Sequence, residues 1–150
     1  MRQRRFIQCD VFTSVPTKGN GLAVVADGEG LSDRDMQAFA AWTNLAETTF
    51  LLPPTTGEAD YKLRIFTPGR EMPFAGHPTL GSCAAWRHLG GKPRTAGVVR
   101  QECGVGIVDI DVARDGEPEQ RQRLLAVDQS DHGRVAFPRD QTQSAPALKQ

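Results

Sequence analysis

The sequence lacks any excess of charge of one sign. Its 150 residues include 18 Lys and Arg against 18 Asp and Glu, so the formal net charge at pH 7 is zero. A neutral chain with no basic stripe gives nucleic acid little long-range attraction. Arg2, Arg4 and Arg5 cluster near the N-terminus, but such a cluster is most simply a solvated start to the first strand. We therefore expect no nucleic-acid partner.

Long hydrophobic runs are also missing. No stretch approaches the roughly 20 apolar residues that a membrane span needs, and the N-terminus has no apolar core of a signal peptide. The three cysteines, Cys9, Cys83 and Cys103, are odd in number and form neither a CxxC pair nor a metal-ligand cluster. Free thiols of this kind are typical of a reducing compartment. We expect a cytoplasmic protein with no membrane contact and no metal site.

The glycines do not make a phosphate-binding loop. Gly21, Gly76 and Gly81 fit neither a GxGxxG nor a Walker pattern, which excludes a nucleotide site of those kinds. Cys83 falls within an apolar, helix-like run, where a free cysteine is more often a small buried filler than a nucleophile.

Apolar and polar residues alternate in most of the chain, which predicts strands. The expected strands are 6–12, 22–25, 48–52, 61–66, 98–103 and 105–112, the last two forming a hairpin near Gly104, with two further strands at 123–127 and 133–137. The loop that follows the first strand is expected to run from Thr13 to Gly21.

Two helices are expected. In the first, Ser32 is a natural N-cap, Asp33 and Asp35 suit the positive helix end, and an apolar face follows at helical spacing, made of Met36, Phe39, Ala40 and Leu45. The second begins at Gly76-His77-Pro78 and ends before Gly90. Small or apolar residues occupy nearly every side of it, which predicts a helix buried all round.

Many strands with one amphipathic and one buried helix favour an α+β fold. We predict a mixed, largely antiparallel sheet curled around the buried central helix, with the amphipathic helix outside. The length suits one domain. We assign residues 1–137 to that domain and residues 138–150, which are polar and contain two prolines, to a flexible C-terminal tail.

The histidine at the start of the second helix is one candidate site residue. Proline disfavours helical geometry in the residue before it and suits the first helical turn, so we expect His77 at the N-cap and Pro78 as the first helical residue. A helix start carries free N–H groups and binds anions readily. The imidazole can bind a substrate carboxylate or move a proton, or it can merely cap the helix.

Glu47 is the second candidate, because it stands between an apolar helix and an apolar strand. Leu45 and Phe50 would partly desolvate its carboxylate, an environment that suits a general acid or base. From the local sequence alone, a loop cap or a pairing with an arginine is the simpler interpretation. Asn20, between Gly19 and Gly21, is either an ordinary turn residue or an amide that holds a substrate carboxylate.

Five blocks follow one another in a recognisable order. They are Asp10-Val11-Phe12-Thr13, the run 19–25, the run 44–50, the run 64–68, and the run 73–81 that contains Gly76-His77-Pro78. In order and spacing, from residue 6 to about residue 112, they resemble the phenazine-biosynthesis (PhzF-like) isomerases, a family related to diaminopimelate epimerase. Five ordered blocks are far more specific than a single motif.

The resemblance implies a half-domain whose mixed sheet wraps a central helix, and a chemistry of cofactor-independent proton abstraction and return on a small carboxylic acid. By the resemblance, Glu47 is the catalytic acid/base and His77 lines the site, where we expect it to act as a second catalytic residue. Five residues are expected to contribute to substrate binding: Asn20, Gly21, Thr48, Gly76 and Pro78. Ala75 stands where the epimerase branch has a cysteine, which argues against a two-cysteine racemase.

The chain departs from the family pattern in two ways. Gly21 stands where the family loop usually has proline, which predicts a more mobile loop. Family members have two homologous halves, and this sequence matches only the first. We therefore predict an isomerase whose cleft is completed by a second copy of the chain, as a homodimer. The alternatives are a non-catalytic half-domain that binds a small acid, or a truncated fragment of a two-domain isomerase.

Overall fold

A mixed sheet makes up most of this computed structural model, which describes residues 3–112, 126–128 and 134–136. Across the sheet the strands run in the order β7-β6-β4-β3-β2-β1-β8-β9, and β5 pairs with β4 beside this path. Their bounds are β1 Phe6–Val11, β2 Asn20–Val25, β3 Glu47–Leu52, β4 Tyr61–Phe66, β5 Glu71–Met72, β6 Val98–Cys103, β7 Gly106–Asp111, β8 Ala126–Asp128 and β9 Arg134–Ala136. The pairs β2–β3 and β4–β6 are parallel, and the others are antiparallel.

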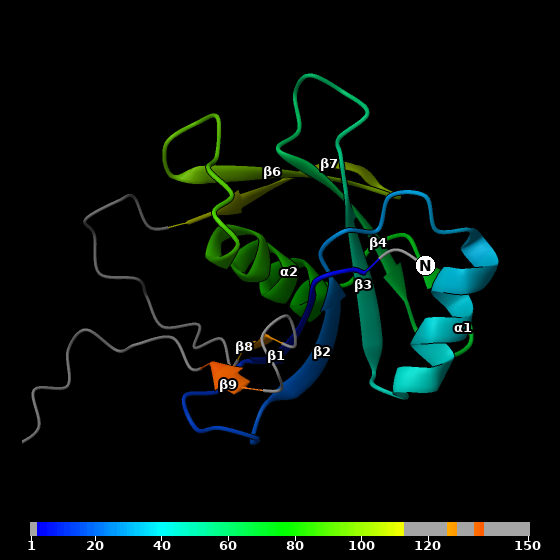
Figure 1. The fold of residues 1–150 in the computed structure, drawn as a ribbon. Coiled ribbons are helices and arrows are strands. Elements are labelled where there is room, and N and C mark those ends of the chain that lie inside the picture. The colour runs from blue at the N-terminus through cyan, green and yellow to red at the C-terminus, as the bar shows by residue number, and fades with distance from the viewer. Residues whose placement is uncertain (1–2, 113–125, 129–133, 137–150) are drawn as a thin grey trace, which may run out of the picture.

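The sheet curls around helix α2 (Gly76–His88), with β6 and β7 on one side of the helix and β1 and β2 on the other (Figure 1). Helix α2 contacts β1, β2, β3, β4 and β6. The larger core cluster joins its Cys83 and Ala85 to inward-facing strand residues such as Leu22, Val24 and Ile65. The predicted α+β fold with a central helix is therefore confirmed.

Hydroxyl and amide groups also fix α2 against the sheet. The Oγ1 atom of Thr49 on β3 lies 2.8 Å from Ser82 Oγ, and both side chains are fully buried. Gln101 Nε2 on β6 donates to Thr79 Oγ1 at 3.0 Å, and Tyr61 Oη donates to Gln101 Oε1 at 3.1 Å. Buried polar groups paired in this way specify one position for the helix.

The expectation that α2 is buried on every side is wrong. Leu80, Ala84 and Arg87 are only partly buried, and Gly76 and His88 are exposed. These residues recur three or four positions apart and therefore share one side of the helix. The sheet is open rather than closed, so it leaves that stripe uncovered.

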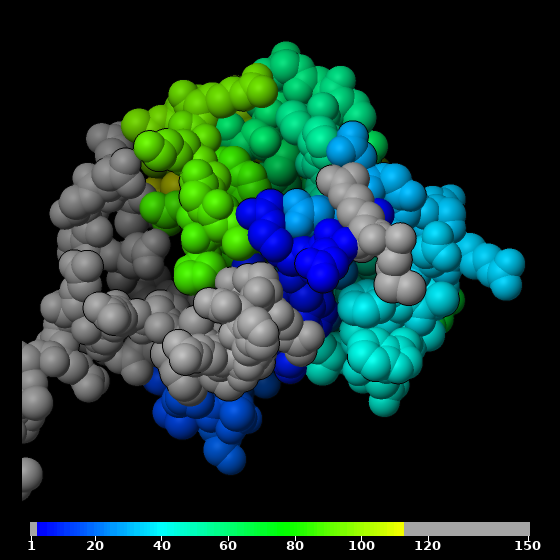
Figure 2. Space-filling model, in the orientation of Figure 1, coloured from blue at the N-terminus to red at the C-terminus, as the bar shows by residue number. Residues whose placement is uncertain are grey.

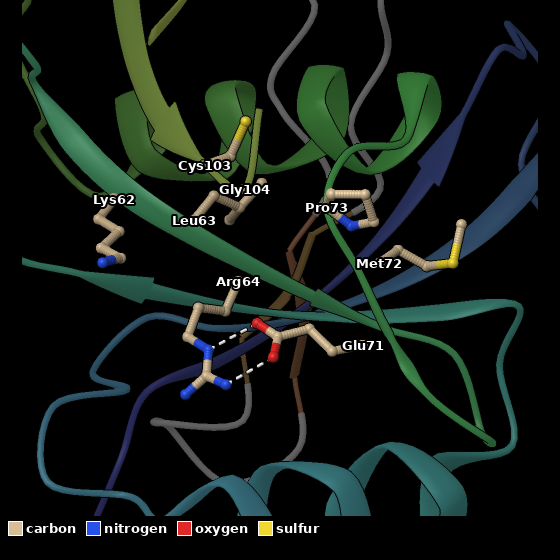
Figure 3. Close-up of a pocket in the computed structure, with 8 residues that line it drawn as sticks. All are labelled: Lys62, Leu63, Arg64, Glu71, Met72, Pro73, Cys103 and Gly104. Carbon is tan, nitrogen blue, oxygen red and sulfur yellow. Dashed lines mark hydrogen bonds and ion pairs between the residues drawn. The ribbon is translucent and has the colours of Figure 1, made fainter. Parts of the chain in front are cut away.

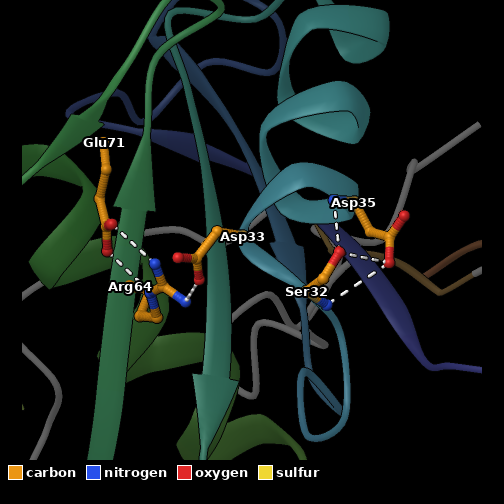
Figure 4. A network of polar contacts seen from close by, with 5 residues as sticks. All are labelled: Ser32, Asp33, Asp35, Arg64 and Glu71. Carbon is orange, nitrogen blue, oxygen red and sulfur yellow. Dashed lines mark hydrogen bonds and ion pairs between the residues drawn. The ribbon is translucent and has the colours of Figure 1, made fainter.

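Helix α1 (Asp33–Thr43) packs on the outer face of the sheet. Ser32 Oγ accepts from Asp35 N, and the Asp35 side chain accepts from Ser32 N, which completes a capping box. Arg64 on β4 donates to Asp33 at the helix start and to Glu71 on β5, so it ties the helix to two strands (Figure 4).

The apolar side of α1 covers a second, smaller core. Its buried Met36 and Ala40 pack against Phe50 and Phe66, while Phe39 contacts Phe6 edge to face. Figure 2 shows the beginning of β1, in dark blue, between the part of the chain that includes α1, in cyan, and the part that includes α2, in green. The helix ends at Thr43, and the C-cap Asn44, with a positive φ of 54°, excludes the predicted Leu45 from it.

Several element boundaries differ from expectation. Strand β2 begins at Asn20, because Val11 and Asp10 of β1 pair with Asn20 and Gly21, so these two residues are not in the loop. Strand β3 begins at Glu47, and the short β5 has no sequence signal. The β6–β7 hairpin is confirmed, with Cys103 opposite Gly106.

The two C-terminal strands, β8 and β9, lie within the predicted ranges 123–127 and 133–137 except for Asp128. The predicted boundary at residue 137 and the predicted tail lie outside the described residues. Neither α1 nor α2 is long and apolar enough to cross a membrane, and they are the helices of the described part of the chain.

Candidate active site

Three chain segments begin at the same place in the fold. Strands β2 and β3 are parallel, with Leu22 opposite Glu47, so both strands start at this end of the sheet. Side chains alternate along a strand, which puts Asn20 on the same face as Leu22, and Glu47 on the same face as Thr49. Leu22 packs in the core around α2 and Thr49 bonds to α2, so this is the face that the helix covers.

The first turn of α2 adds an imidazole to the two strand ends. His77 Nε2 lies 3.1 Å from Glu47 Oε2, and the two side chains are only 9% and 18% exposed. On the other side of the ring, Asn20 Nδ2 lies 3.2 Å from His77 Nδ1. The structure therefore brings together Glu47, His77 and Asn20, which come from three elements.

The contact between Glu47 and His77 is close but poorly aligned. Glu47 Oε2 and His77 Nε2 are both buried, and within the described residues neither has a hydrogen-bond partner of good geometry. Burial lowers the pKa of His77 from its ordinary value of 6.5, and the nearby Glu47 opposes that shift. A neutral imidazole beside a carboxylate, with hydrogen-bonding capacity left unused, is an arrangement typical of functional sites.

The helix start differs from the prediction. Ala75 is the N-cap, with extended backbone and no side-chain cap, so Gly76, His77 and Pro78 are the first three helical residues. Proline is tolerated there because the first N–H groups of a helix have no partner within it. The expectation that His77 caps the helix is therefore wrong. Its side chain is directed to Glu47 instead.

Comparison with known proteins assigns the family. The family model described as phenazine biosynthesis-like protein, PhzC-PhzF, matches residues 9–150. The chain belongs to the PhzC-PhzF family. The resemblance drawn from its five sequence blocks is thus confirmed.

The chain is also similar to several curated proteins. It is 46% identical over 121 residues to Antisense-enhancing sequence 1 of Schizosaccharomyces pombe, which is 80% of this chain and 40% of that protein. It is 48% identical over 80 residues to a trans-2,3-dihydro-3-hydroxyanthranilate isomerase of Pseudomonas fluorescens, which is 53% of this chain and 28% of that one.

A solved structure has the same fold. The crystal structure of a Bacillus anthracis phenazine biosynthesis protein of the PhzF family superposes with a TM-score of 0.67 at 34% identity. The superposed region covers 75% of this chain and 37% of the Bacillus anthracis chain. The chain thus spans less than half the length of the first of these relatives.

The other predicted binding residues do not all lie beside Glu47 and His77. Gly76 is exposed at the helix start and Pro78 is buried. A β-carbon at Gly21 would contact Leu45, on the face of the sheet away from α2. Thr48 is fully buried on that same face, where its hydroxyl lies 2.8 Å from Thr43 Oγ1. The structure therefore does not bring the Thr48 side chain to Glu47, and its predicted role stays a prediction.

One residue beside His77 and one on the opposite face of the sheet were not singled out from the sequence as site candidates. Phe12 is 65% exposed and adopts a left-handed φ of 66°, and its ring centroid lies 6.4 Å from that of His77. Asp10 is 7% exposed, and its Oδ2 atom has no hydrogen-bond partner in the described residues. A charged residue within an apolar strand is a sequence signal that could have drawn attention to Asp10, whereas no local pattern predicts the backbone conformation of Phe12.

A hollow in the surface lies elsewhere, beside β4, between the part of that strand that pairs with β6 and the part that pairs with β5 (Figure 3). In the described chain it is lined by Lys62, Leu63, Arg64, Glu71, Met72, Pro73, Cys103 and Gly104. None of the predicted site residues is among them. Arg64 and Glu71 already bond to each other there, and Lys62 Nζ lies 3.4 Å from Glu102. These charges are paired, which favours a structural role.

Proposed function

We propose that this PhzC-PhzF family member is a cofactor-independent isomerase in which Glu47 is the acid/base. The observation that carries the proposal is the 3.1 Å approach of His77 Nε2 to Glu47 Oε2 at the start of α2. Both atoms are buried, and neither makes a well-formed hydrogen bond within the described residues. Relatives at 46% to 48% identity are named as isomerases, which supports the same class of reaction.

In the proposed reaction the Glu47 carboxylate takes a proton from a C–H bond of a small carboxylic acid. The electron pair of that bond forms a new double bond, the former double bond shifts, and Glu47 returns the proton at another carbon. The reaction consumes no oxidant or cofactor, because the proton and the electrons stay within substrate and enzyme. The neutral His77 orients the Glu47 carboxylate.

The start of α2 would hold the carboxylate of the substrate. The N–H groups of Gly76 and His77 are in the first turn, where helices have no internal partners for them, and Ala75 provides no side-chain cap. Pro78 has no N–H. The proposed anion contact therefore falls on Gly76 and His77, next to the acid/base.

The test compares Glu47→Gln with the unchanged chain on trans-2,3-dihydro-3-hydroxyanthranilate, the substrate in the names of three relatives, and on a panel of small unsaturated acids in D2O. Deuterium entry into the carbon skeleton reports proton abstraction. We expect the substitution to reduce exchange by about 10²- to 10⁴-fold. Glu58→Gln, at an exposed position, is the matched control. Exchange that persists undiminished in Glu47→Gln would exclude Glu47 as the base.

The opposite wall of the cleft is a further part of the proposal. Asn20 and Phe12 are exposed beside the buried pair, so one side of the site is open. We propose that a second copy of the chain covers it in the cytoplasm, where Cys9, Cys83 and Cys103, which form no disulfide, would remain reduced. A monomeric mass at micromolar concentration, by analytical ultracentrifugation of an exchange-active sample, would rule out the homodimer.

A second candidate function is binding without turnover. The chain spans 40% and 37% of two of the relatives it matches, so a second homologous half is not part of the matched region. A half-domain or fragment of this kind would bind a small acid at the start of α2. Equal binding of a small acid by the unchanged chain and by Glu47→Gln, measured by calorimetry, with no deuterium exchange in either protein, would favour this alternative.

A further inference from the structure

We propose that Asn20 is a positioning residue that holds His77 in one tautomer, with the ring proton on Nε2, the nitrogen that lies 3.1 Å from Glu47 Oε2. The catalytic meaning of this arrangement rests on the proposed function. The tautomer itself is a property of the resting protein and does not depend on turnover.

The contact on the far side of the imidazole decides the tautomer. Asn20 Nδ2 lies 3.2 Å from His77 Nδ1. An amide nitrogen can only donate a hydrogen bond, so Nδ1 must accept it and carries no proton. A neutral imidazole has one N–H group, which is then on Nε2. That nitrogen is the one 3.1 Å from Glu47 Oε2.

Reversing the Asn20 amide would give an unfavourable arrangement. Its oxygen would then face Nδ1 and require the ring proton there. His77 Nε2 would be left as an acceptor, 3.1 Å from a carboxylate oxygen that is also an acceptor, and both atoms are buried. Two buried acceptors at that distance repel each other. The orientation in which Asn20 donates is therefore the one that Glu47 requires.

The backbone around Asn20 is held in place although its side chain is exposed. Asn20 pairs with Val11 across the β1–β2 ladder. The preceding Gly19 is packed so closely that a β-carbon would lie 2.3 Å from Val11 O and 2.4 Å from Asp10 Oδ1. The main chain thus fixes where the Asn20 amide begins, which suits a residue that orients another side chain.

The tautomer can be observed directly by long-range ¹H–¹⁵N correlation spectra of the histidine rings at a pH where His77 is neutral. The chain has three histidines, and the signal that disappears in His77→Gln identifies His77. We expect a protonated Nε2 and an unprotonated Nδ1. In Asn20→Asp the carboxylate can only accept, so Nδ1 should become protonated. Gln8→Glu, the same chemical change at an exposed position of β1, should leave the ring signals unchanged.

Kinetics separate positioning from substrate binding. If Asn20 acts through His77, Asn20→Asp should lower kcat at least about tenfold, the kind of loss that follows a wrong tautomer, with KM little changed. A raised KM with unchanged kcat would instead assign Asn20 to substrate binding and overturn the proposal.

The two proposals fail separately. A protonated Nδ1 in the unchanged chain would overturn the tautomer assignment and leave the isomerase proposal standing. An Nε2-protonated ring in a protein without any exchange activity would overturn the isomerase proposal alone.

Discussion

Gly81 on α2 lies against Leu22 on β2 so closely that a β-carbon at position 81 would come within 2.6 Å of Leu22 Cδ2 and 2.8 Å of Val11 Cγ2. His77 is four residues earlier on the same side of the helix. The missing side chain at Gly81 therefore lets α2 approach β1 and β2, and this approach carries His77 to the starts of β2 and β3, where Asn20 and Glu47 lie.

Adding one methyl group at Gly81 should disturb this packing. We expect Gly81→Ala to lower the free energy of unfolding by about 1–3 kcal/mol, because Leu22 and Val11 must move to make room. Gly76→Ala, in the same helix, is the control, since a β-carbon at position 76 would meet no atom within 4 Å. It should change stability little, or raise it slightly through helix propensity. Equal urea midpoints for the two variants would contradict the close contact.

The burial of His77 predicts a pH-dependent stability. Its pKa is below the ordinary 6.5 in the folded chain, so the unfolded chain binds a proton there more readily. The contribution of the neutral His77 ring to the stability of the fold is fully present above about pH 6.5, and it is lost as the pH falls through the lower pKa of the folded chain. Compared with His77→Gln, the unchanged chain should lose more unfolding free energy between about pH 7.5 and about pH 5. His88→Gln, at an exposed position, should follow the unchanged chain.

Local signals predicted the parts of the fold that depend on neighbours in the sequence. The alternation of 61–66 matches β4, and the Ser32 and Asp35 pattern matches the capping box of α1. The start of β2 could not be found in this way, because Asn20 belongs to the strand only through its pairing with Val11. The N-cap of α2 was predicted at His77, because proline disfavours helical geometry in the residue before it. That preference is weak, and the helix begins at Gly76, with Ala75 as the N-cap.

The candidate site was predictable as a list of residues but not as a geometry. Glu47 and His77 stood out through their blocks, yet taken alone Glu47 had a simpler structural interpretation and His77 an equally simple one. Their contact depends on the parallel pairing of β2 with β3 and on the close approach at Gly81. The separation of Thr48 from Glu47 follows from strand alternation once β3 is known to begin at Glu47.

The buried chain of Tyr61, Gln101 and Thr79 should contribute to stability. Gln101→Leu would remove two hydrogen bonds and leave the Tyr61 and Thr79 hydroxyls without these partners. We expect a loss of about 2–6 kcal/mol in unfolding free energy, from a cost of about 1–3 kcal/mol for each of the two buried hydroxyls that lose their Gln101 partner. The double variant Tyr61→Phe with Gln101→Leu should recover part of this loss, since it removes one of the two hydroxyls that lost the Gln101 side chain. Additive losses in urea unfolding would contradict coupling through the hydrogen bond.

The left-handed backbone of Phe12 should lower stability measurably. A bulky residue at a φ of 66° is strained, whereas glycine adopts this conformation freely. Both Phe12→Gly and Phe12→Ala remove the exposed ring, so their difference isolates the backbone. We expect Phe12→Gly to be more stable than Phe12→Ala by about 1 kcal/mol. At Phe74, which is also exposed but has an ordinary φ, glycine should be the less stable of the same two variants. If alanine were preferred at both positions, Phe12 would not be strained. If glycine is preferred only at Phe12, the strain lies beside His77, where strained backbone often accompanies function.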